Sequence, residues 1–364
     1  MSDWRLLSDA KAAAAEGLAT DEVLAERAGT GDSPPTLRLY SYASHCVLVG
    51  RFQEVAREVD LARAQALGIA VNRRPTGGGT ILMGEDQLGV ALCVSGRGVG
   101  GRPRQLMDRF ADGVRSGLGA LGVDARFRGK NDLEVGGRKI AGLGVCRTST
   151  GGLLFHASVL LDLDVGLMAE VLRSPFVARK PDELEAVRRR TVTLRQLAGS
   201  SVTQPALRAA LEQGFGSSLE AVLVPGSLDT AERQAIAARV AQRYATEAWL
   251  AASGGVDPRQ HTASLRTPAG SLQVRATLVG GSFQAVDIRG DFFADSAAIA
   301  DLEARLRWSL AAPDRIDATV AAWAQRWPEV DFSAKDVSAA LTRAAQGAPY
   351  GCFVTPRSSS ATHA

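Results

Sequence analysis

Three consecutive glycines, Gly77 to Gly79, constrain the fold of this chain more than any other feature. They follow a short apolar segment at residues 69–72 and precede Ile81 and Leu82, so the sequence predicts a strand, a glycine loop and further strands. Glycine permits positive φ angles and lets the backbone approach a ligand closely. Successive backbone N–H groups in such a turn can hold an anion, such as a phosphate or a carboxylate.

Two arginines, Arg73 and Arg74, begin the run Arg-Arg-Pro-Thr-Gly-Gly-Gly and add charge-assisted hydrogen-bond donors to the loop. The run matches neither the GxGxxG pattern of dinucleotide-binding folds nor the GxxxxGK[ST] pattern of P-loops. A plain hairpin turn would explain the glycines alone. The adjoining arginines favour a binding function.

A second group of polar residues lies around an expected hairpin at residues 132–135 and 139–146. Asn131 and Asp132 stand at the start of the first strand, and Lys139 begins the second strand just after the turn. A lysine fixed there would offset negative charge that develops on a phosphate or an acyl oxygen. The alternative is a solvated lysine beside a turn, the commoner fate of an isolated lysine. The chain has 42 basic residues, of which five are lysines, and Lys139 is one of these five.

The two segments resemble the lipoyl- and octanoyl-transferring branch of the biotin/lipoate protein ligase superfamily. The run from Arg73 to Gly79 is similar to the family's RRxSGGG loop, and the segment from Asn131 to Gly142 is similar to its NDL…GKKIxG segment. His156 stands where the family has an HG[ST] strand. Further similar segments follow the family's order over about residues 4–245, and residues 258–345 resemble, more loosely, the accessory domain of bacterial lipoate–protein ligases.

The resemblance implies an α+β fold, in which a mixed sheet is flanked by helices as in class II aminoacyl-tRNA synthetases and biotin ligases. It also implies a small α+β accessory domain. The expected catalytic domain spans residues 1–250, the accessory domain 256–350 and a flexible tail 351–364. Two domains suit a chain of 364 residues, since single domains usually contain roughly 100–200.

The resemblance further implies an ATP-dependent lipoate–protein ligase. Such an enzyme activates lipoic or octanoic acid as the acyl-adenylate and transfers it to a lysine of a lipoyl carrier domain, such as the glycine cleavage H protein or a 2-oxoacid dehydrogenase E2. Lys139 would be the catalytic residue that bridges the acyl carbonyl and the α-phosphate. Mg²⁺ follows from the use of ATP, with Asp132 as its expected ligand. The residues expected to bind substrate or ATP are Arg73, Arg74, Thr76, Gly77, Gly78, Gly79, Thr80, Ile81, Leu82, Asn131, Asp132, Gly142 and His156.

Two alternatives stay open. An octanoyltransferase of the same family would form a thioester on a cysteine, for which Cys146 is the candidate, although a small buried hydrophobe is the other interpretation of this residue. A non-catalytic relative that binds the acyl group or the carrier is the second alternative. The chain also departs from the ligase pattern, because Met83 and Gly84 begin the segment where ligases have His-Asp, and Ala157 follows His156 where they have glycine.

Composition excludes several other classes. The net charge of +3 does not indicate a nucleic-acid-binding protein. The four cysteines lie far apart without a CxxC pair, so neither a disulfide scaffold nor a structural zinc site is expected. No signal peptide and no run of about 18 apolar residues is evident, so we expect a cytoplasmic protein that does not span a membrane. Periodicity predicts helices at 6–28, 104–121, 166–173, 204–214, 229–246 and 296–306, and a strand pair at 271–278 and 282–289.

Overall fold

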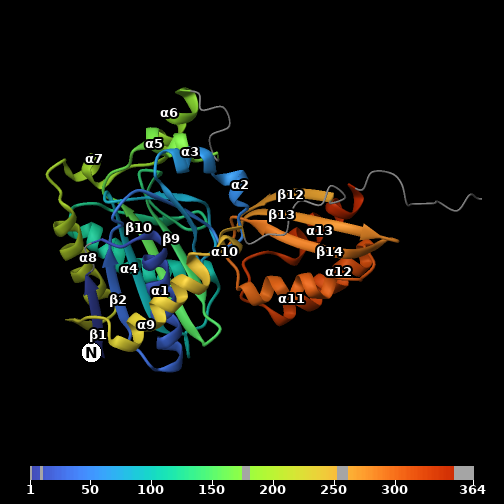
Figure 1. Cartoon of the computed structure of the whole chain (residues 1–364), viewed down its shortest axis with the longest axis horizontal. Helices are drawn as coiled ribbons and strands as arrows, with labels where there is room; N and C mark the ends of the chain where they lie inside the picture. Colours follow the sequence, from blue (N-terminus) through green and yellow to red (C-terminus); the bar gives the residue numbers. More distant parts are fainter. Residues whose placement is uncertain (1, 9–10, 174–180, 252–260, 348–364) are drawn as a thin grey trace, which may run out of the picture.

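The computed structural model describes residues 2–8, 11–173, 181–251 and 261–347 (Figure 1). An eight-stranded mixed sheet in the order β11-β1-β2-β6-β10-β9-β8-β7 forms the centre of the larger part. Strand β1 runs parallel to β2 and β11, and the other neighbouring pairs are antiparallel. The strands are β1 (Ser2–Ser8), β2 (Thr36–Tyr40), β6 (Gln87–Ser95), β7 (Arg126–Arg128), β8 (Asp132–Val135), β9 (Arg138–Arg147), β10 (Gly152–Leu160) and β11 (Ala221–Pro225).

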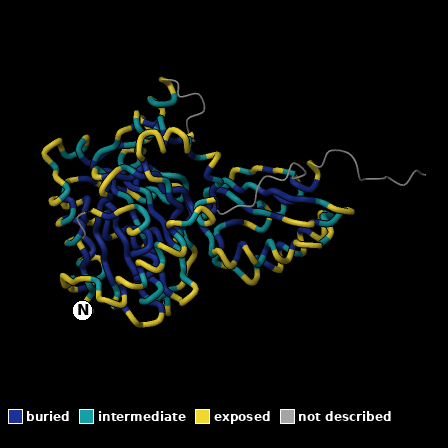
Figure 2. The backbone as a smooth tube through the Cα atoms, in the orientation of Figure 1, coloured by how far each residue is buried: buried dark blue, intermediate teal, exposed yellow. Residues whose placement is uncertain are grey.

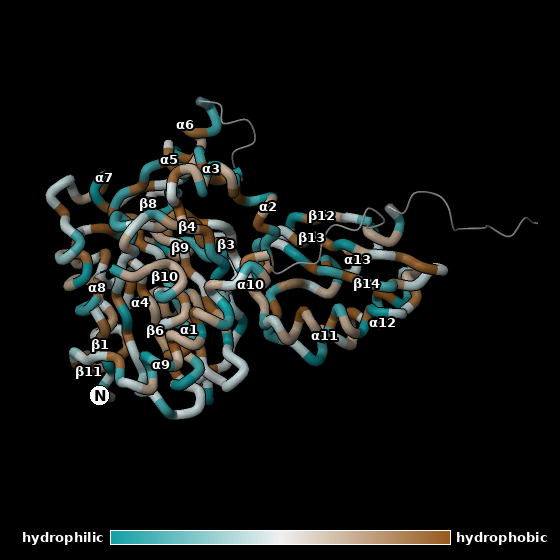
Figure 3. The backbone as a smooth tube through the Cα atoms, viewed as in Figure 1, coloured by the Kyte–Doolittle hydropathy of each residue, from teal (hydrophilic) through white to brown (hydrophobic). Residues whose placement is uncertain are grey.

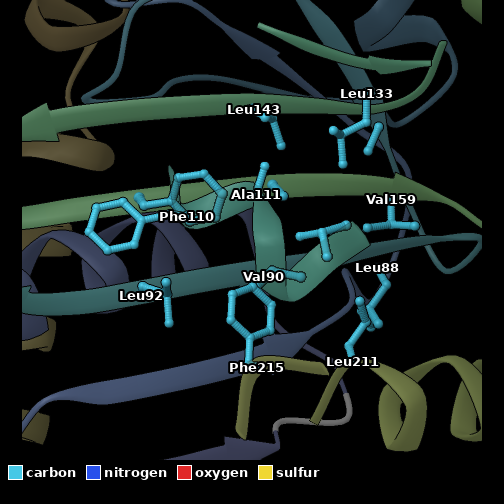
Figure 4. Close-up of a cluster of buried hydrophobic side chains, with 14 of the residues drawn as sticks. Leu88, Val90, Leu92, Phe110, Ala111, Leu133, Leu143, Val159, Leu211 and Phe215 are labelled. Carbon is cyan, nitrogen blue, oxygen red and sulfur yellow. The ribbon is translucent and has the colours of Figure 1, made fainter. Parts of the chain in front are cut away.

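Helices cover both faces of this sheet. On one face α4 (Pro103–Ala120) and α8 (Gln204–Ser218) pack against the sheet, and α1 (Ala14–Thr30) packs against the other with α9 (Thr230–Arg239) and the π-helix η1 (Val240–Tyr244). Strand β6 is therefore apolar on both sides, since burial on both faces favours a continuous apolar strand. Figure 4 shows its residues Leu88, Val90 and Leu92 with Phe110, Leu211 and Phe215 from the two helices.

A three-stranded sheet in the order β4-β3-β5 lies beside the large one and presents the glycine loop. Its strands are β3 (Cys46–Val49), β4 (Ala70–Arg73) and β5 (Ile81–Met83), so the glycines connect β4 to β5 as the sequence predicts. The remaining helices of this part are short: α2 (Val55–Glu58), α3 (Leu61–Ala66), α5 (Val165–Val171), α6 (Pro181–Arg190), α7 (Leu194–Ala198) and α10 (Glu247–Ala251).

The C-terminal part has a hydrophobic core of its own. Strands β12 (His261–Thr267), β13 (Gly270–Val279) and β14 (Ser282–Gly290) form an antiparallel sheet covered by α11 (Ser296–Leu306), α12 (Pro313–Arg326) and α13 (Ala334–Gln346). The two buried interiors appear as separate dark regions in Figure 2 and as separate groups of hydrophobic segments in Figure 3. We propose that they correspond to the catalytic and accessory domains expected from the sequence.

Two adjacent phenylalanines join the two parts. Phe292 belongs to the C-terminal core, whereas Phe293 packs into the core of the large sheet. The N–H group of Gly78 donates a hydrogen bond to the carbonyl oxygen of Phe292 at 3.1 Å. A Cβ atom on Gly77 would lie 1.9 Å from the same oxygen, so only glycine fits there in this arrangement. The glycine loop therefore also serves as a contact surface between the two parts.

The expected α+β class is confirmed, and several predicted elements are found. The helix predicted at 104–121 is α4, and the strand pair predicted at 271–278 and 282–289 corresponds to β13 and β14. The helix predicted at 6–28 is wrong at its start, because residues 2–8 form β1 and the helix begins at Ala14. The expected domain boundary near 256 and the tail at 351–364 lie outside the described residues. Among the described residues, no helix is long and apolar enough to span a bilayer.

Candidate active site

A pocket of about 440 Å³, called the slot below, lies between the glycine loop and strands β8 to β10. At its exposed end are the polar side chains of Lys130, Asn131, Asp132 and Lys139. At its buried end are side chains of the apolar cluster around α1. These are Leu18, Tyr40, Tyr42, Leu48, Ile81 and Met83. The slot therefore suits a ligand with an anionic head and an apolar chain.

Lys139 is the second residue of β9 and is held at the exposed end of the slot. Its Nζ atom lies 2.7 Å from Oδ1 of Asp132, and each side chain is about one-third exposed (30% and 32%). The carbonyl oxygen of Lys139 accepts a hydrogen bond from the N–H group of Val192 at 2.8 Å, which fixes the backbone. A Cβ atom on Gly142 would lie 3.0 Å from Nζ, so this glycine leaves room for the lysine to lie across the strand.

Arg74 lines the slot, but most of its N–H groups donate to backbone carbonyl oxygens of the glycine loop and of β3. Its guanidinium donates to the carbonyl oxygens of Leu48 and Gly77, each at 2.8 Å, and of Gly79 at 2.6 Å. Burial lowers its pKa to about 10, so it remains a cation at neutral pH. Arg74 therefore shapes the glycine loop and contributes a buried positive charge beside the slot.

Arg73 does not line the slot, contrary to its expected binding role. Its side chain is fully buried and donates to the carbonyl oxygens of Gly50, Gln53 and Leu250 at 2.7–2.8 Å. Arg73 ends β4 and Arg74, which precedes a proline, follows it; consecutive residues of extended backbone point to opposite sides, so only one of the two arginines faces the slot. Arg73 connects the turn after β3 to α10 and acts as a structural residue.

His156, which is half-buried, and the buried Thr76 form a pair at the wall of the slot. The Oγ1 atom of Thr76 lies 2.9 Å from Nε2 of His156, and burial, with a smaller contribution from Arg74, lowers the pKa of the histidine to about 3. A Cβ atom on Gly144 would lie 2.1 Å from Nε2, so the imidazole occupies space that this glycine leaves open. The imidazole is therefore neutral at physiological pH and can support the wall without adding charge.

The depressed pKa of His156 predicts a pH dependence of stability. In the unfolded chain His156 binds a proton below about pH 6.5, whereas in the folded chain it does so only below about pH 3. The free energy of unfolding contributed by this group is therefore greatest above pH 6.5 and falls as the pH drops through this window. We expect urea unfolding to show a smaller loss between pH 7 and pH 5 in His156→Gln than in the wild type. An equal loss in both proteins would contradict the assignment.

The slot brings together only part of the expected set. The expected residues that line it are Arg74, Gly79, Thr80, Ile81, Asn131, Asp132, Lys139, Gly142 and His156. Arg73, Thr76, Gly77, Gly78 and Leu82 lie behind its walls, and Gly78 alone of the three loop glycines has a positive φ angle, 90°. Residues that sequence reasoning missed include Tyr42, Lys130 and Asp291. Lys130 could have been singled out as a scarce lysine next to the Asn131 motif.

The donor set does not form a protein cage for a metal. Within the described ranges, no group of three or more His, Cys, Asp or Glu side chains could hold an ion. The expected Mg²⁺ ligand, Asp132, pairs instead with Lys139. The residues present therefore do not fit a dedicated Mg²⁺ site.

The cysteines in the described segments lie outside the lining of the slot. Cys46 and Cys93 are buried in β3 and β6, where they pack in the apolar cluster around α1. Cys146 lies on β9 and packs against the cluster around α1, and burial raises the pKa of its thiol well above the ordinary value. A raised pKa removes the thiolate that nucleophilic attack requires. The geometry therefore gives no support to Cys146 as a nucleophile.

Comparison with known proteins identifies relatives over most of the larger part. Residues 13–216 match the model of the lipoyl protein ligase A/B catalytic domain. The octanoyltransferase LipM of Kyrpidia tusciae is 33% identical over 272 residues, which is 68% of this chain and 98% of that protein. About a third of this chain lies outside that match. The name of this relative agrees with the alternative raised above rather than with the ligase interpretation.

Two solved structures of similar fold carry the name of lipoate–protein ligases. A bipartite lipoate protein ligase from Thermoplasma acidophilum, studied with its E2 lipoyl domain, is 25% identical with a TM-score of 0.63, covering 71% of this chain and all of that one. A lipoate-protein ligase A bound with ATP is 26% identical with a TM-score of 0.60, covering 69% of this chain and 99% of that one.

Proposed function

Because the chain belongs to the lipoyl protein ligase A/B catalytic-domain family, we propose that this enzyme transfers a lipoyl or octanoyl group to a lysine of a lipoyl carrier domain. The observation that carries the proposal is the two-ended slot, with Lys139 and Asp132 at its exposed end and an apolar cluster at its buried end. The apolar end would hold the acyl chain. The polar end would hold the activated carbonyl, where the acceptor lysine arrives.

The side chains at the exposed end would act by position and charge. The ammonium of Lys139, fixed by Asp132, would stabilise the oxyanion that forms when an amine attacks the acyl carbonyl. Asn131 donates from Nδ2 to the carbonyl oxygen of Leu143 at 2.8 Å and thus holds the start of β8 against β9. It is a positioning residue, because this bond keeps Asp132 in reach of Lys139.

We propose an acyl-adenylate as the acyl donor. Among the described cysteines none lines the slot, and a thioester route through Cys146 would need a thiol whose pKa is lowered rather than raised. A second cavity of about 520 Å³ adjoins the slot and shares with it Thr80, Asp132 and Lys139 as well as the cations Arg190 and Arg266. These cations suit the phosphates of a nucleotide, and the ATP-bound structural relative supports this choice.

An octanoyltransferase is the second candidate, favoured by the name of the 33% identical relative. The second cavity also contains the carboxylates of Glu54, Glu58 and Asp291, which would repel a triphosphate in the present arrangement. A transferase would take the acyl group from a carrier thioester without ATP. In that case the nucleophile would be a group other than Cys146, or the acceptor lysine would attack the thioester directly.

The two donors can be separated with purified protein and an unmodified lipoyl domain. One reaction contains lipoic acid, ATP and Mg²⁺, and the other contains octanoyl acyl carrier protein. Mass spectrometry of the lipoyl domain and release of pyrophosphate are the measurements. We expect lipoylation in the first reaction, with Cys146→Ala keeping at least about half of the wild-type rate.

Modification in the second reaction alone would replace the ligase by the transferase. Loss of that activity in Cys146→Ala, with Cys93→Ala as the buried control, would restore the thioester mechanism. If the lipoyl domain is modified in neither reaction, the remaining interpretation is a non-catalytic relative that binds the acyl group or the carrier.

A further inference from the structure

Two tyrosines stand at the buried end of the slot, and only one of them has its hydroxyl paired. Tyr40 ends β2 and Tyr42 follows two residues later, with ring centroids 5.6 Å apart in an edge-to-face arrangement. The Tyr40 hydroxyl donates to Oδ2 of Asp21 at 2.8 Å, and Asp21 pairs with the buried Arg38 at 2.7 Å. Tyr40 is thus fixed and satisfied by a network behind the slot.

Tyr42 differs in this respect. Its side chain is 1% exposed, it lines the slot, and its hydroxyl has no hydrogen-bond partner within the described part of the chain. The hydroxyl of Tyr40 lies close by and acts to lower the pKa of Tyr42, but the two hydroxyls do not meet the geometry of a hydrogen bond. Burial raises the pKa of Tyr42, so the hydroxyl remains a neutral donor at any physiological pH.

A buried hydroxyl without an acceptor is unfavourable, and a ligand that supplies one is bound better than a ligand that covers it with alkyl groups. The groups around it are apolar or already paired. Leu18, Leu48 and Met83 offer no strong acceptor, and Asp21 is engaged by Tyr40 and Arg38. The acceptor must therefore come from water or from the bound chain.

We infer that Tyr42 makes this enzyme select acyl chains with a hydrogen-bond acceptor near the distal end, such as the dithiolane sulfurs of a lipoyl group, over plain alkyl chains such as octanoyl. The inference rests on the proposed function, because it assigns the buried end of the slot to the acyl chain. Sulfur is a weak acceptor, but it also packs well against aromatic rings, and two rings meet at this position.

The test compares Tyr42→Phe with Tyr40→Phe. Each protein is assayed with lipoic acid, octanoic acid and 6-thiaoctanoic acid, which carries one sulfur without the ring. If the enzyme uses acyl carrier thioesters and not free acids, the thioesters of the same three acyl groups are assayed instead. In Tyr42→Phe we expect the lipoyl-to-octanoyl ratio of kcat/KM to fall about three- to tenfold, mainly through KM, because a neutral hydrogen bond is worth roughly that factor. The ratio of kcat/KM for 6-thiaoctanoic acid to that for octanoic acid should also fall, by a smaller factor.

Tyr40→Phe should keep the wild-type ratio within about twofold, because its hydroxyl faces Asp21, although its unfolding temperature should drop. An unchanged lipoyl-to-octanoyl ratio of kcat/KM in Tyr42→Phe would overturn the inference. If both acids are still turned over, the proposed function is not affected by that result. If the wild type turns over neither acid in either form, the proposed function fails. The Kd ratio of the free acids, measured by calorimetry in both variants, then decides the inference separately.

Discussion

Replacing Lys139 by alanine is expected to lower kcat/KM for acyl transfer by about 10²–10³-fold, the usual loss when one group that stabilises an oxyanion is removed. The ammonium is the charged donor that Asp132 fixes at the exposed end of the slot. Arg74 cannot replace it, because its donors are engaged with the carbonyl oxygens of Leu48, Gly77 and Gly79. Steady-state modification of a lipoyl domain, followed by mass spectrometry, measures the effect.

The controls separate chemistry from folding. Lys139→Arg keeps the charge, but its planar fork differs in shape from a compact ammonium, so we expect it to recover little activity. Lys11→Ala removes another lysine, in an exposed pair with Glu85, and should leave the rate unchanged. The free energy of unfolding of Lys139→Ala should stay within about 1 kcal/mol of the wild type, because the pair is partly exposed. Full activity in Lys139→Ala would show that the slot is not the reaction centre.

The sequence predicts the polar end of the slot better than its apolar end. The glycine loop and the hairpin of Lys139 are local patterns, and each places some of its residues in the lining of the slot, Gly79 from the loop and Lys139 from the hairpin. Tyr42 belongs to no motif. Its position depends on the packing of α1 against β2 and β3, which no local pattern specifies. Strand β1 was missed for the same reason, because its partners are β2 and the distant β11.

The two arginines before the glycines show where sequence reasoning stops. Strand geometry predicts that Arg73 and Arg74 point to opposite faces, but not which face becomes the slot. That choice depends on residues 50–53 and on α10, which is more than 170 residues away in the sequence and supplies carbonyl oxygens to Arg73. The resemblance treated both arginines as binding residues, because a motif does not distinguish a side chain that contacts the ligand from one that holds the loop.

Replacing Arg73 by methionine is expected to lower the free energy of unfolding by about 3–5 kcal/mol. The guanidinium is fully buried, and burial together with neighbouring arginines lowers its pKa to about 9, so it is still charged at pH 7. Its charge is compensated by carbonyl oxygens, of which those of Gly50 and Leu250 lie at 2.8 Å and that of Gln53 at 2.7 Å. Methionine fills a similar volume but leaves these acceptors without donors in a buried region.

Urea unfolding at pH 7, fitted for the midpoint and the m-value, measures this loss. Arg73→Lys should recover part of it, because an ammonium has three donors where the guanidinium has five. Arg63→Met removes an arginine from an exposed pair with Glu170 and should change stability by less than about 1 kcal/mol. If Arg73 instead served as a ligand-binding residue, Arg73→Met would unfold at nearly the wild-type urea concentration and lose only activity. A stability loss with little change in KM at low temperature, where the variant stays folded, is the outcome that the buried carbonyl contacts require.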